Sequence, residues 1–484
     1  MANQFTLPTL FRAISDVQIQ AGVGALHKPF MESLQILAAN FLQSEVTPVA
    51  THRFELDIES AVREFARTVV EWSYGALEPE DVEAMPGSIR YRDNSYRRMR
   101  SKTKHGSILT LFGNIELIRA TYRRGRKGKV ISPLEASLGI GCGASPAAQE
   151  LVGKQMAIAG ASQQRASEAI EARSGAKIGH EKIRKITKTL AGEMEEHRQE
   201  CQLVQLQTWI DQVHSAGEKA VLSVSRDGVC ICIAPIGYYE VASVATLSVF
   251  SQGERIGTVY LAAAPEENQT TLSKQLTALL TEVIRSHGDQ LERIAYVSDA
   301  GKVETAYWRN VLSKFYVDGV RIPMERTLDY YHASLRLTTI ADGFKLTASA
   351  REKWLKSNRS RLKEEGGLGR VMRSISKMAE LYGVKKSKLT EYNKAIKYLR
   401  KYRRFMDYAD KQARGLPIGS GIVESACKQI VSERMKLSGM RWKPAGMQDV
   451  MTLRSILLSQ TWDATFHQKL LSNSPVEVLY INAA

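Results

Sequence analysis

The sequence has no long hydrophobic run. No stretch approaches the ~18 apolar residues that a membrane-spanning helix needs. The first residues, MANQFTLPTLFRAISD, lack the basic start, the long apolar stretch and the small-residue cleavage site of a secretory signal. Only five cysteines occur, an odd number at scattered positions, which argues against a disulfide framework. We therefore expect a protein of a reducing cytoplasm that makes no contact with a membrane.

Acidic residues are also few relative to basic ones. The chain contains 67 Lys and Arg against 51 Asp and Glu, so its formal net charge is +16 and its isoelectric point is near 9.5. This excess of positive charge predicts a polyanionic partner, meaning DNA, RNA or an anionic membrane surface. Because no membrane segment is expected, nucleic acid is the favoured partner. At roughly 100–200 residues per domain, the length predicts about two to four domains.

The first two regions are expected to be helical and then basic. Residues 1–85 carry apolar residues at three-to-four spacing, which predicts helices without obvious chemistry. Residues 86–135 include SILTLFGNIELIRATYRRGRKGK, whose alternation about Gly113-Asn114 predicts a β-hairpin. This basic hairpin is expected to lie along a DNA phosphate backbone through Arg123, Arg124, Arg126 and Lys127. The alternative interpretation is a charge run that only faces solvent.

Residues 136–200 predict a helix-turn-helix-like DNA-binding region. SPAAQELVGKQMAIAG begins with Ser145 at an N-cap position and Pro146 at the first helical position. A second helix capped by Ser162 and a Ser-Gly turn lead to a basic amphipathic helix, GHEKIRKITKTLAGEMEEH. Its expected apolar stripe comprises Ile183, Ile186, Leu190 and Met194, and its expected DNA-contacting cations are Lys182, Arg184, Lys185 and Lys188. An ordinary helical linker bundle is the alternative.

Residues 201–334 predict the first part of an α/β catalytic core. Three β-rich runs, AVLSVSRDGVCICIAPI, YEVASVATLSVFSQG and RIGTVYLAAAP, indicate an antiparallel meander. A capped helix, TTLSKQLTALLTEVIRSHG, leads to the apolar strand LERIAYVSD, which is expected to run parallel. An aromatic helix and a shorter strand, RTLDYYH, follow. The order β-β-β-α-β-α-β, with a late helix, predicts an RNase H-like fold.

The remaining chain predicts a helical insertion and the last part of the same core. Residues 335–414 are basic and helical in pattern, which indicates an insertion that covers or grips substrate. Residues 415–475 include GSGIVESACKQIVSERMK, a helix that opens after Gly-Ser-Gly. Glu424 lies at the border of its apolar stripe and is free to point towards the sheet edge. Lys428, one turn further, is expected to contact a phosphate or to tune this acid.

Three acidic residues stand where a two-metal phosphoryl-transfer site needs them. Asp227 and Asp299 are each expected to end a buried strand, and Glu424 lies on the late helix. Two Mg²⁺ (or Mn²⁺) ions about 3.5–4 Å apart require oxygen ligands, and carboxylates from separate elements can bracket them. The sequence therefore predicts a metal-dependent enzyme that cuts and joins nucleic acid, with these three acids as its catalytic metal ligands.

The same segments resemble bacterial insertion-sequence transposases of the DDE type, in the ISKra-type group related to Mutator-like enzymes. The matching segments are SRDGV at Asp227, VSDAGKVETAYW at Asp299, LDYYHA at Asp329 to Ala333, and LPIGSGIVESACKQIVSERMKLSGMRW at Leu416 to Trp442. The resemblance covers about residues 90–470. It implies an acidic triad of Asp227, Asp299 and Glu424, Mg²⁺-dependent strand cleavage and transfer, and binding to the terminal inverted repeats of a double-stranded DNA element. The resemblance also implies a bacterial cytoplasmic protein that is associated with the nucleoid.

Four further positions are expected to be accessory. Asp329 is interpreted either as an accessory ligand or as part of a strand that directs His332 to the site, and His332 is alternatively a buried core histidine. Arg441 and Trp442 are expected either to stack on an unpaired base or to pack as a core Trp with an Arg on its face. Relatives often carry a Cys-x-x-Cys pair after the hairpin, where this chain reads YRRGRKGK, so no zinc is expected.

The predicted reaction also bears on assembly. Cutting two DNA ends and joining them to one target needs two active sites, so a homodimer or larger oligomer on DNA is expected. Two other classes stay open, a catalytically silent transposase-derived DNA-binding regulator and an RNase H-like nuclease acting on branched DNA. The intact acids favour the enzyme over the regulator, and the nuclease does not explain the helix-turn-helix-like region or the insertion.

Overall fold

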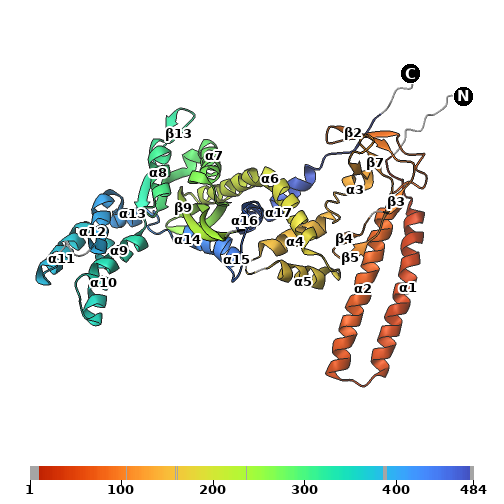
Figure 1. The fold of residues 1–484 in the computed structure, drawn as a ribbon, viewed down its shortest axis with the longest axis horizontal. Helices are drawn as coiled ribbons and strands as arrows, with labels where there is room; N and C mark the ends of the chain where they lie inside the picture. Colours follow the sequence, from red (N-terminus) through yellow and green to blue (C-terminus); the bar gives the residue numbers. More distant parts are fainter. Residues whose placement is uncertain are drawn as a thin grey trace. The chain divides into compact units, whose positions relative to one another are not determined.

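The computed structural model describes residues 10–104, 106–158, 160, 162–235, 237–384 and 390–479 (Figure 1). The fold is mixed α/β, as predicted. The chain forms two compact units: one contains the described residues up to Met194 and those from Phe466 onwards, and the other is Glu195–Thr465. Among the described residues, no helix combines the length and apolar character that crossing a membrane requires.

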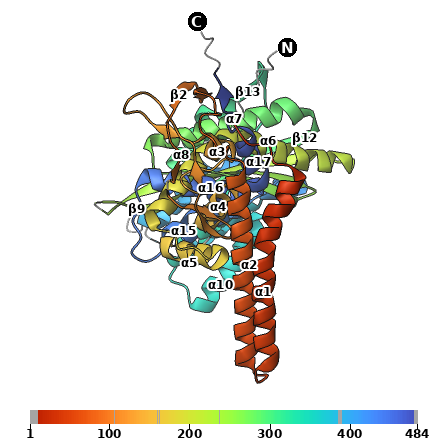
Figure 2. The same ribbon diagram turned by 90° about the vertical axis from the view of Figure 1, so that its right-hand side faces the viewer.

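The first unit begins with two long helices, α1 (Asp16–Gln43) and α2 (Pro48–Ala76), which lie side by side as a hairpin (Figures 1 and 2). Ser15 and Gln18 form a capping box at the start of α1, and Thr47 caps α2 with Pro48 in its first turn. Two stacked aromatic pairs join the helices, Phe30 with Phe65 and Phe41 with Phe54. The helices predicted for this region are therefore confirmed.

Small sheets follow the helical hairpin. The largest has the order β16-β1-β2-β7-β8, and its edge strand β16 comes from the C-terminal segment. The strands are β1 (Ser88–Tyr91), β2 (Asn94–Arg98), β3 (Thr103–Lys104), β4 (Ile108–Thr110), β5 (Gly113–Ile115), β6 (Ile118–Arg119), β7 (Tyr122–Arg123), β8 (Val130–Ile131) and β16 (Glu477–Val478). Strands β4 and β5 form the predicted hairpin, but its turn lies at Leu111 and Phe112, because Gly113 already pairs with Thr110. The basic residues follow this hairpin in sequence: Arg123 ends β7, and Arg124, Arg126 and Lys127 lie in the turn between β7 and β8.

The helices of the predicted DNA-binding region are α3 (Pro133–Ser137), α4 (Pro146–Ala157), α5 (Gln163–Ser174) and α6 (His180–Ser215). Ser145 and Ser162 cap α4 and α5 as predicted, and Gly175 ends α5 in the left-handed conformation at φ 73°. The predicted stripe of Ile183, Ile186, Leu190 and Met194 is buried. Helix α6 is much longer than predicted, and the expected domain boundary at residue 200 falls inside it.

The second unit is built on a five-stranded sheet of β9 (Ala220–Ile233), β10 (Tyr238–Ser251), β11 (Glu254–Ala263), β12 (Leu291–Ser298) and β15 (Glu325–Leu328). The strand order is β11-β10-β9-β12-β15. Strands β9, β10 and β11 form the predicted antiparallel meander, whereas β12 runs parallel to β9 and β15 runs parallel to β12. The predicted strand directions are therefore confirmed.

Both faces of this sheet are covered. On one face, side chains of β9, β10 and β12 pack with α6, α7 (Thr270–His287) and α8 (Lys302–Asn310). On the other face, Val221, Ala295 and Val297 pack with Leu416 and Ile422. Because side chains alternate along a strand, neighbouring residues of β9 point into different layers. This alternation decides which residues of β9 face the site.

The predicted insertion is a helical layer with its own apolar core. It comprises α9 (Tyr330–Asp342), α10 (Ala348–Leu362), α11 (Gly367–Leu381), α12 (Thr390–Lys401) and α13 (Tyr408–Ala413), which lie together in Figure 1. Its first helix starts at Tyr330, so the expected boundary at residue 335 falls inside α9. The remaining elements are β13 (Tyr316–Val317), β14 (Val320–Arg321), α14 (Gly421–Ala426), α15 (Glu433–Met435), α16 (Pro444–Leu458), α17 (Trp462–Leu471) and the 3-10 turns Glu267–Gln269, Gly288–Gln290, Leu312–Lys314 and Arg403–Phe405.

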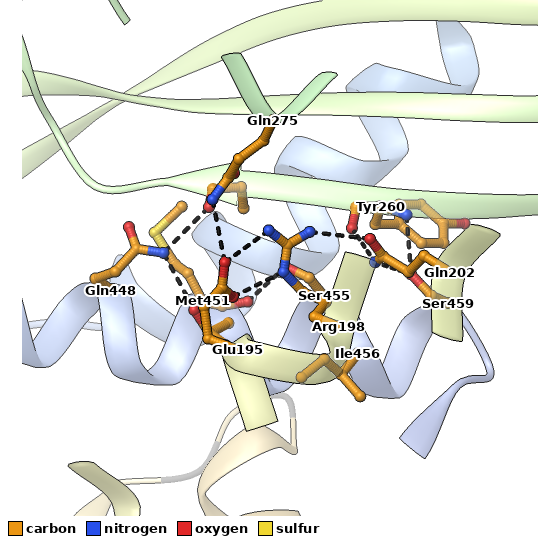
Figure 3. A network of polar contacts seen from close by, with 12 residues as sticks. Glu195, Arg198, Gln202, Tyr260, Gln275, Gln448, Met451, Ser455, Ile456 and Ser459 are labelled. Carbon is orange, nitrogen blue, oxygen red and sulfur yellow. Dashed lines mark hydrogen bonds and ion pairs between the residues drawn. The ribbon is translucent and has the colours of Figure 1, made fainter. Parts of the chain in front are cut away.

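A buried polar network fixes the second half of α6 to the sheet (Figure 3). Arg198 is almost fully buried and donates two hydrogen bonds of 2.7 Å to Glu195 and one of 2.9 Å to Gln202. The Gln202 amide in turn donates to the Tyr260 carbonyl on β11 at 2.9 Å and to Ser459 after α16 at 3.1 Å. The buried charge is therefore paired, and the network ties α6, β11 and α16 into one rigid support.

Candidate active site

Asp227 lies within β9, not at its end. The strand continues for six residues beyond Asp227, pairing with β10 throughout, so the predicted strand end at this residue is wrong. By alternation Asp227 shares the sheet face of Val221, towards the segment that contains Ile422. Its neighbour Arg226 points to the opposite layer, where it donates to Ser273 and Gln269 at 3.0 and 2.9 Å. The long meander allows an acid to face the site from the middle of a strand.

Asp299 follows the last residue of β12, as predicted. Its carboxylate accepts a hydrogen bond of 2.8 Å from the Gly301 N–H, which holds the side chain at the mouth of the loop before α8. Arg326 of the adjacent strand β15 donates to the Asp299 carbonyl at 3.4 Å. The carboxyl end of a parallel strand is where open α/β sheets place their sites.

A further acid, Glu304, lies beside Asp299 and was not singled out from the sequence. It occupies the first turn of α8 and is only 8% exposed. A Cβ at Gly301 would lie 2.0 Å from one Glu304 carboxylate oxygen and 2.9 Å from Asp299 Oδ1, so the two acids lie against the same backbone position and a side chain there would displace them. Burial, together with the nearby Asp299 carboxylate, raises the pKa of Glu304. The sequence feature that could have identified Glu304 is its place in the first turn of the helix that follows Asp299.

Glu424 lies on α14, which covers the same face of the sheet as Asp227. Its side chain is 44% exposed, and Ser420 Oγ donates a hydrogen bond of 2.8 Å to Glu424 Oε1. The helix continues as a π-helical turn, Cys427–Ser432, a departure from α-geometry that is common at functional sites. Within this turn the Cys427 thiol is buried near the Asp227 carboxylate, and burial, together with that carboxylate, raises the thiol pKa. The predicted apolar stripe of this helix is confirmed, with Val423, Ala426 and Ile430 buried.

Asp329 organises the loop that precedes Glu424. It is fully buried at the N-cap of α9, so the prediction that LDYYH forms a strand is wrong beyond Leu328. One carboxylate oxygen accepts from the Ser420 N–H at 2.7 Å, and the other accepts from His332 N and Nδ1 at 2.7 and 2.6 Å. Burial alone favours the neutral acid, but these hydrogen bonds outweigh it and lower the pKa of Asp329. Asp329 thus positions Ser420 and His332.

His332 connects Asp329 to Glu424. Its Nδ1 lies 3.7 Å from Glu424 Oε1, and its ring is about one-third exposed, so it is not a buried core histidine. The hydrogen bond to Asp329 raises the pKa of His332, with the Asp299 and Glu424 carboxylates adding to the effect. The described residues contain one group of three whose possible metal-ligand atoms all lie within 4.8 Å of one another. This group is Asp329, His332 and Glu424.

The predicted acids also influence one another. Burial raises the pKa of Asp227, and the carboxylates of Asp299 and Glu424 add to the increase. Buried carboxylates close to other carboxylates are costly unless a cation or shared protons neutralise them. Asp227, Asp299, Glu304 and Glu424 therefore lie near enough to influence one another electrostatically, and carboxylate oxygens are the ligand type that a hard divalent cation prefers.

The other accessory positions lie away from these carboxylates. Lys428 is exposed, with its ammonium 4.0 Å from Glu433, so the expected tuning of Glu424 finds no support. Trp442 pairs with Ile233 at the end of β9 and donates its indole N–H to the Met435 carbonyl at 3.2 Å. Trp442 therefore packs against the protein, in agreement with the interpretation of a core Trp. The Arg on its face is Arg434, however, and not Arg441, which is exposed near Gly237.

The predicted DNA-contacting residues all lie in the first unit. Arg124, Arg126 and Lys127 are exposed in the β7–β8 turn, and Arg123 is half-buried. On α6, Arg184, Lys185 and Lys188 are exposed. Lys182 differs, because it is half-buried against Gly143 and burial lowers its pKa. The exposed residues of both predicted DNA-contacting segments are therefore accessible to a partner, whereas Arg123 and Lys182 are only partly so.

Comparisons with known proteins add no assignment. No protein-family model matches the chain, and a search of curated proteins finds no match.

Proposed function

We propose that the protein is a DNA transposase whose second unit is an RNase H-like catalytic core. The observation that carries the proposal is the placement of three acids on adjoining elements: Asp227 on β9, Asp299 after the adjacent strand β12, and Glu424 on α14, which packs on β9 and β10. The strand order and the late helix support it, because they match the element order expected for such a core. The exposed basic surfaces of the first unit support a DNA substrate.

The proposal assigns two divalent cations to these carboxylates, because carboxylate oxygens are the ligands that such ions prefer. Asp227, Asp299 and Glu424 would hold Mg²⁺ or Mn²⁺, with Glu304 supporting the Asp299 side of the site. When bound, such ions activate a water or a DNA 3′-hydroxyl and stabilise the leaving oxygen of an in-line displacement. The protein supplies the carboxylates from rigid elements, so no Ser or Tyr nucleophile is required.

The protein's own contribution is to orient Glu424. Ser420 Oγ donates to Glu424 Oε1, which leaves the second oxygen, Oε2, available to a cation. Asp329 fixes the Ser420 backbone and the His332 ring, so both residues beside Glu424 are held by one buried carboxylate. This is the arrangement of an outer shell that orients a metal ligand.

Glu304 gives a prediction with a distinctive pH dependence. Because the folded-state pKa of this acid is raised above its ordinary value of 4.5, its ionisation costs stability as the pH rises through that raised pKa. Glu304→Gln should therefore raise the melting temperature of the metal-free protein by a few degrees at pH 8 and have almost no effect near pH 4.5. Adding Mn²⁺ should narrow the difference in melting temperature between the variant and the parent protein. The Glu304→Gln variant should also cleave DNA strands about 10–100-fold more slowly.

Calorimetry with and without Mn²⁺, at several pH values, measures this difference. Glu292→Gln on the exposed side of β12 is the matched control and should show neither effect. An equal melting temperature of Glu304→Gln and the parent protein at pH 8 would remove Glu304 from the site.

The β7–β8 turn gives a prediction about DNA affinity. Changing Arg124, Arg126 and Lys127 to Ala should weaken binding to every sequence and reduce the salt-dependence slope by about 2–3, because phosphate contacts release counterions without reading bases. Fluorescence anisotropy at several salt concentrations measures the slope. The matched triple variant is Lys353→Ala, Lys356→Ala and Arg373→Ala in the insertion. A larger loss in that variant would transfer the main phosphate contacts to the insertion.

The function itself is tested with the DNA that flanks the gene. Duplexes from both flanks, incubated with the protein and Mn²⁺, should be nicked at the ends of inverted repeats and then joined to a second duplex. Specific binding without nicking would instead identify a silent DNA-binding regulator. Preferential cutting of branched DNA, with no end preference, would identify a nuclease.

A further inference from the structure

The helical hairpin of α1 and α2 has almost no packed interior, although both helices are long. The two helices contain 28 and 29 residues, all described by the structure, and none of these residues is buried. Phe30, Phe41, Phe54 and Phe65 supply the stacked contacts between the helices. An isolated pair of helices without a buried core is marginal in water, since most helical stability comes from packing of an apolar face.

Large aliphatic side chains point away from the hairpin interior, especially near the tip. Ile36, Leu42, Val46, Val49 and Leu56 are each more than half exposed. Val17 and Met31 are also exposed along α1. Helix α1 contains only Asp16, Lys28 and Glu32 as charged residues, although the chain as a whole is 24% charged. A helix that is apolar on its outer as well as its inner face is normally covered.

The charge of the hairpin excludes nucleic acid as the cover. Residues 16–76 contain four Lys or Arg and eight Asp or Glu, so this segment is acidic within a chain of net charge +16. An acidic surface is repelled by DNA phosphates and by anionic lipid headgroups. The remainder of the chain is strongly basic, and two copies of it repel each other. The nearly uncharged outer face of α1 is therefore a surface on which two copies can meet without like-charge repulsion.

We propose that this outer face, together with the hairpin tip, is a self-association surface that packs against the same surface of a second copy of this chain. The two hairpins would form a four-helix bundle around a two-fold axis, which is the self-complementary arrangement of a closed dimer. A 28-residue helix is about 42 Å long and about 10 Å wide, so its face presents on the order of 400 Å². With α2 and the tip included, the surface approaches the about 800 Å² per partner of a standard interface.

The test uses the full-length protein without DNA. Analytical ultracentrifugation over a micromolar concentration series should show a dimer. The triple variant Ile36→Glu, Leu42→Glu and Val49→Glu should raise the dimer dissociation constant by roughly 100-fold or more, because anchors at the centre of an interface dominate affinity. The matched control, Ser349→Glu, Gln412→Glu and Gln468→Glu, adds the same charge at exposed polar positions outside the hairpin and should leave the dimer intact.

Circular dichroism shows whether the variant keeps its helices, since the substituted side chains are not those that join α1 to α2. A single Leu42→Glu variant gives the same readout with the least disturbance and should raise the dissociation constant in the same direction. A monomeric parent protein, or a dimer unaffected by both variants, would overturn the proposal. Loss of the dimer in the control variant as well would also overturn it, because the effect would then follow from charge alone.

Discussion

Asp227→Asn, Asp299→Asn and Glu424→Gln are each expected to reduce DNA strand cleavage by at least about 10³-fold while leaving DNA affinity within about twofold. Each change keeps the shape of the side chain but removes the charge that a divalent cation needs. The three acids lie in the second unit, whereas the exposed basic residues expected to hold DNA lie in the first. Cleavage and binding should therefore separate. A quenched-flow or gel assay of end cleavage, paired with anisotropy, measures both.

The controls are acids of the same unit that lie outside the site. Asp289→Asn, at an exposed turn, and Glu433→Gln, one π-helical turn beyond Glu424, should retain cleavage within a few-fold of the parent protein. Full cleavage by any one of the three site variants would remove that residue from the assignment. Lost cleavage in Glu433→Gln would mean that the π-helical segment, rather than Glu424 itself, is what matters.

Asp329→Ala is expected to have the second largest effect, on stability as well as on cleavage. The change leaves the buried Ser420 N–H and the His332 N–H without their acceptor. The free energy of unfolding should fall by about 2–3 kcal/mol. This is the lower part of the range for a charged acceptor, because His332 is partly exposed. At about 2–4 °C per kcal/mol, the melting temperature should fall by roughly 5–10 °C. Cleavage should fall further, because Glu424 loses its two supporting side chains.

The pH dependence of this loss follows from the two pKa shifts. The Asp329 pKa is lowered, so its contribution is present above its ordinary value of 3.8 and is lost as the pH falls through the lowered pKa. The His332 pKa is raised, so the paired form contributes below 6.5 and is lost as the pH rises through the raised pKa. The destabilisation by Asp329→Ala should therefore be greatest between these two values. Asp329→Asn should lose less, since its amide oxygen still accepts one N–H. A destabilisation that does not decrease on either side of this pH range would contradict the Asp329–His332 pair.

The sheet of the second unit could be predicted from sequence patterns alone. The meander, the crossover helix and the parallel strand before Asp299 each have strong local signals, namely turn residues, an amphipathic period and an unbroken apolar run. The late helix was also predictable, since Val423, Ala426 and Ile430 have helical spacing. The π-helical turn within it was not, because one extra residue in a helical turn leaves almost no mark on the apolar pattern.

Other features depend on contacts between segments that are distant in sequence. The length of β9 hid the position of Asp227, because β9 stays paired with β10 as far as Ile233 although its pairing with β12 ends at Ser225. The role of Asp329 emerges only when Ser420, far along the chain, meets its carboxylate. Likewise, the strand formed by Glu477 and Val478 joins the sheet of the first unit, and no local signal marks a partner so remote. The turn at Leu111 was misplaced because Thr110 satisfies it from its side chain, without a glycine in the turn itself.

The most direct test of the proposed site is anomalous diffraction from crystals of the protein grown with Mn²⁺. The account predicts Mn²⁺ at about 2.0–2.3 Å from carboxylate oxygens of Asp227 and Asp299, with Glu424 completing the site and Asp329 remaining bonded to Ser420 and His332. Mn²⁺ held by Asp329 and His332 with none at Asp227, or no ordered Mn²⁺ among these residues, would contradict it.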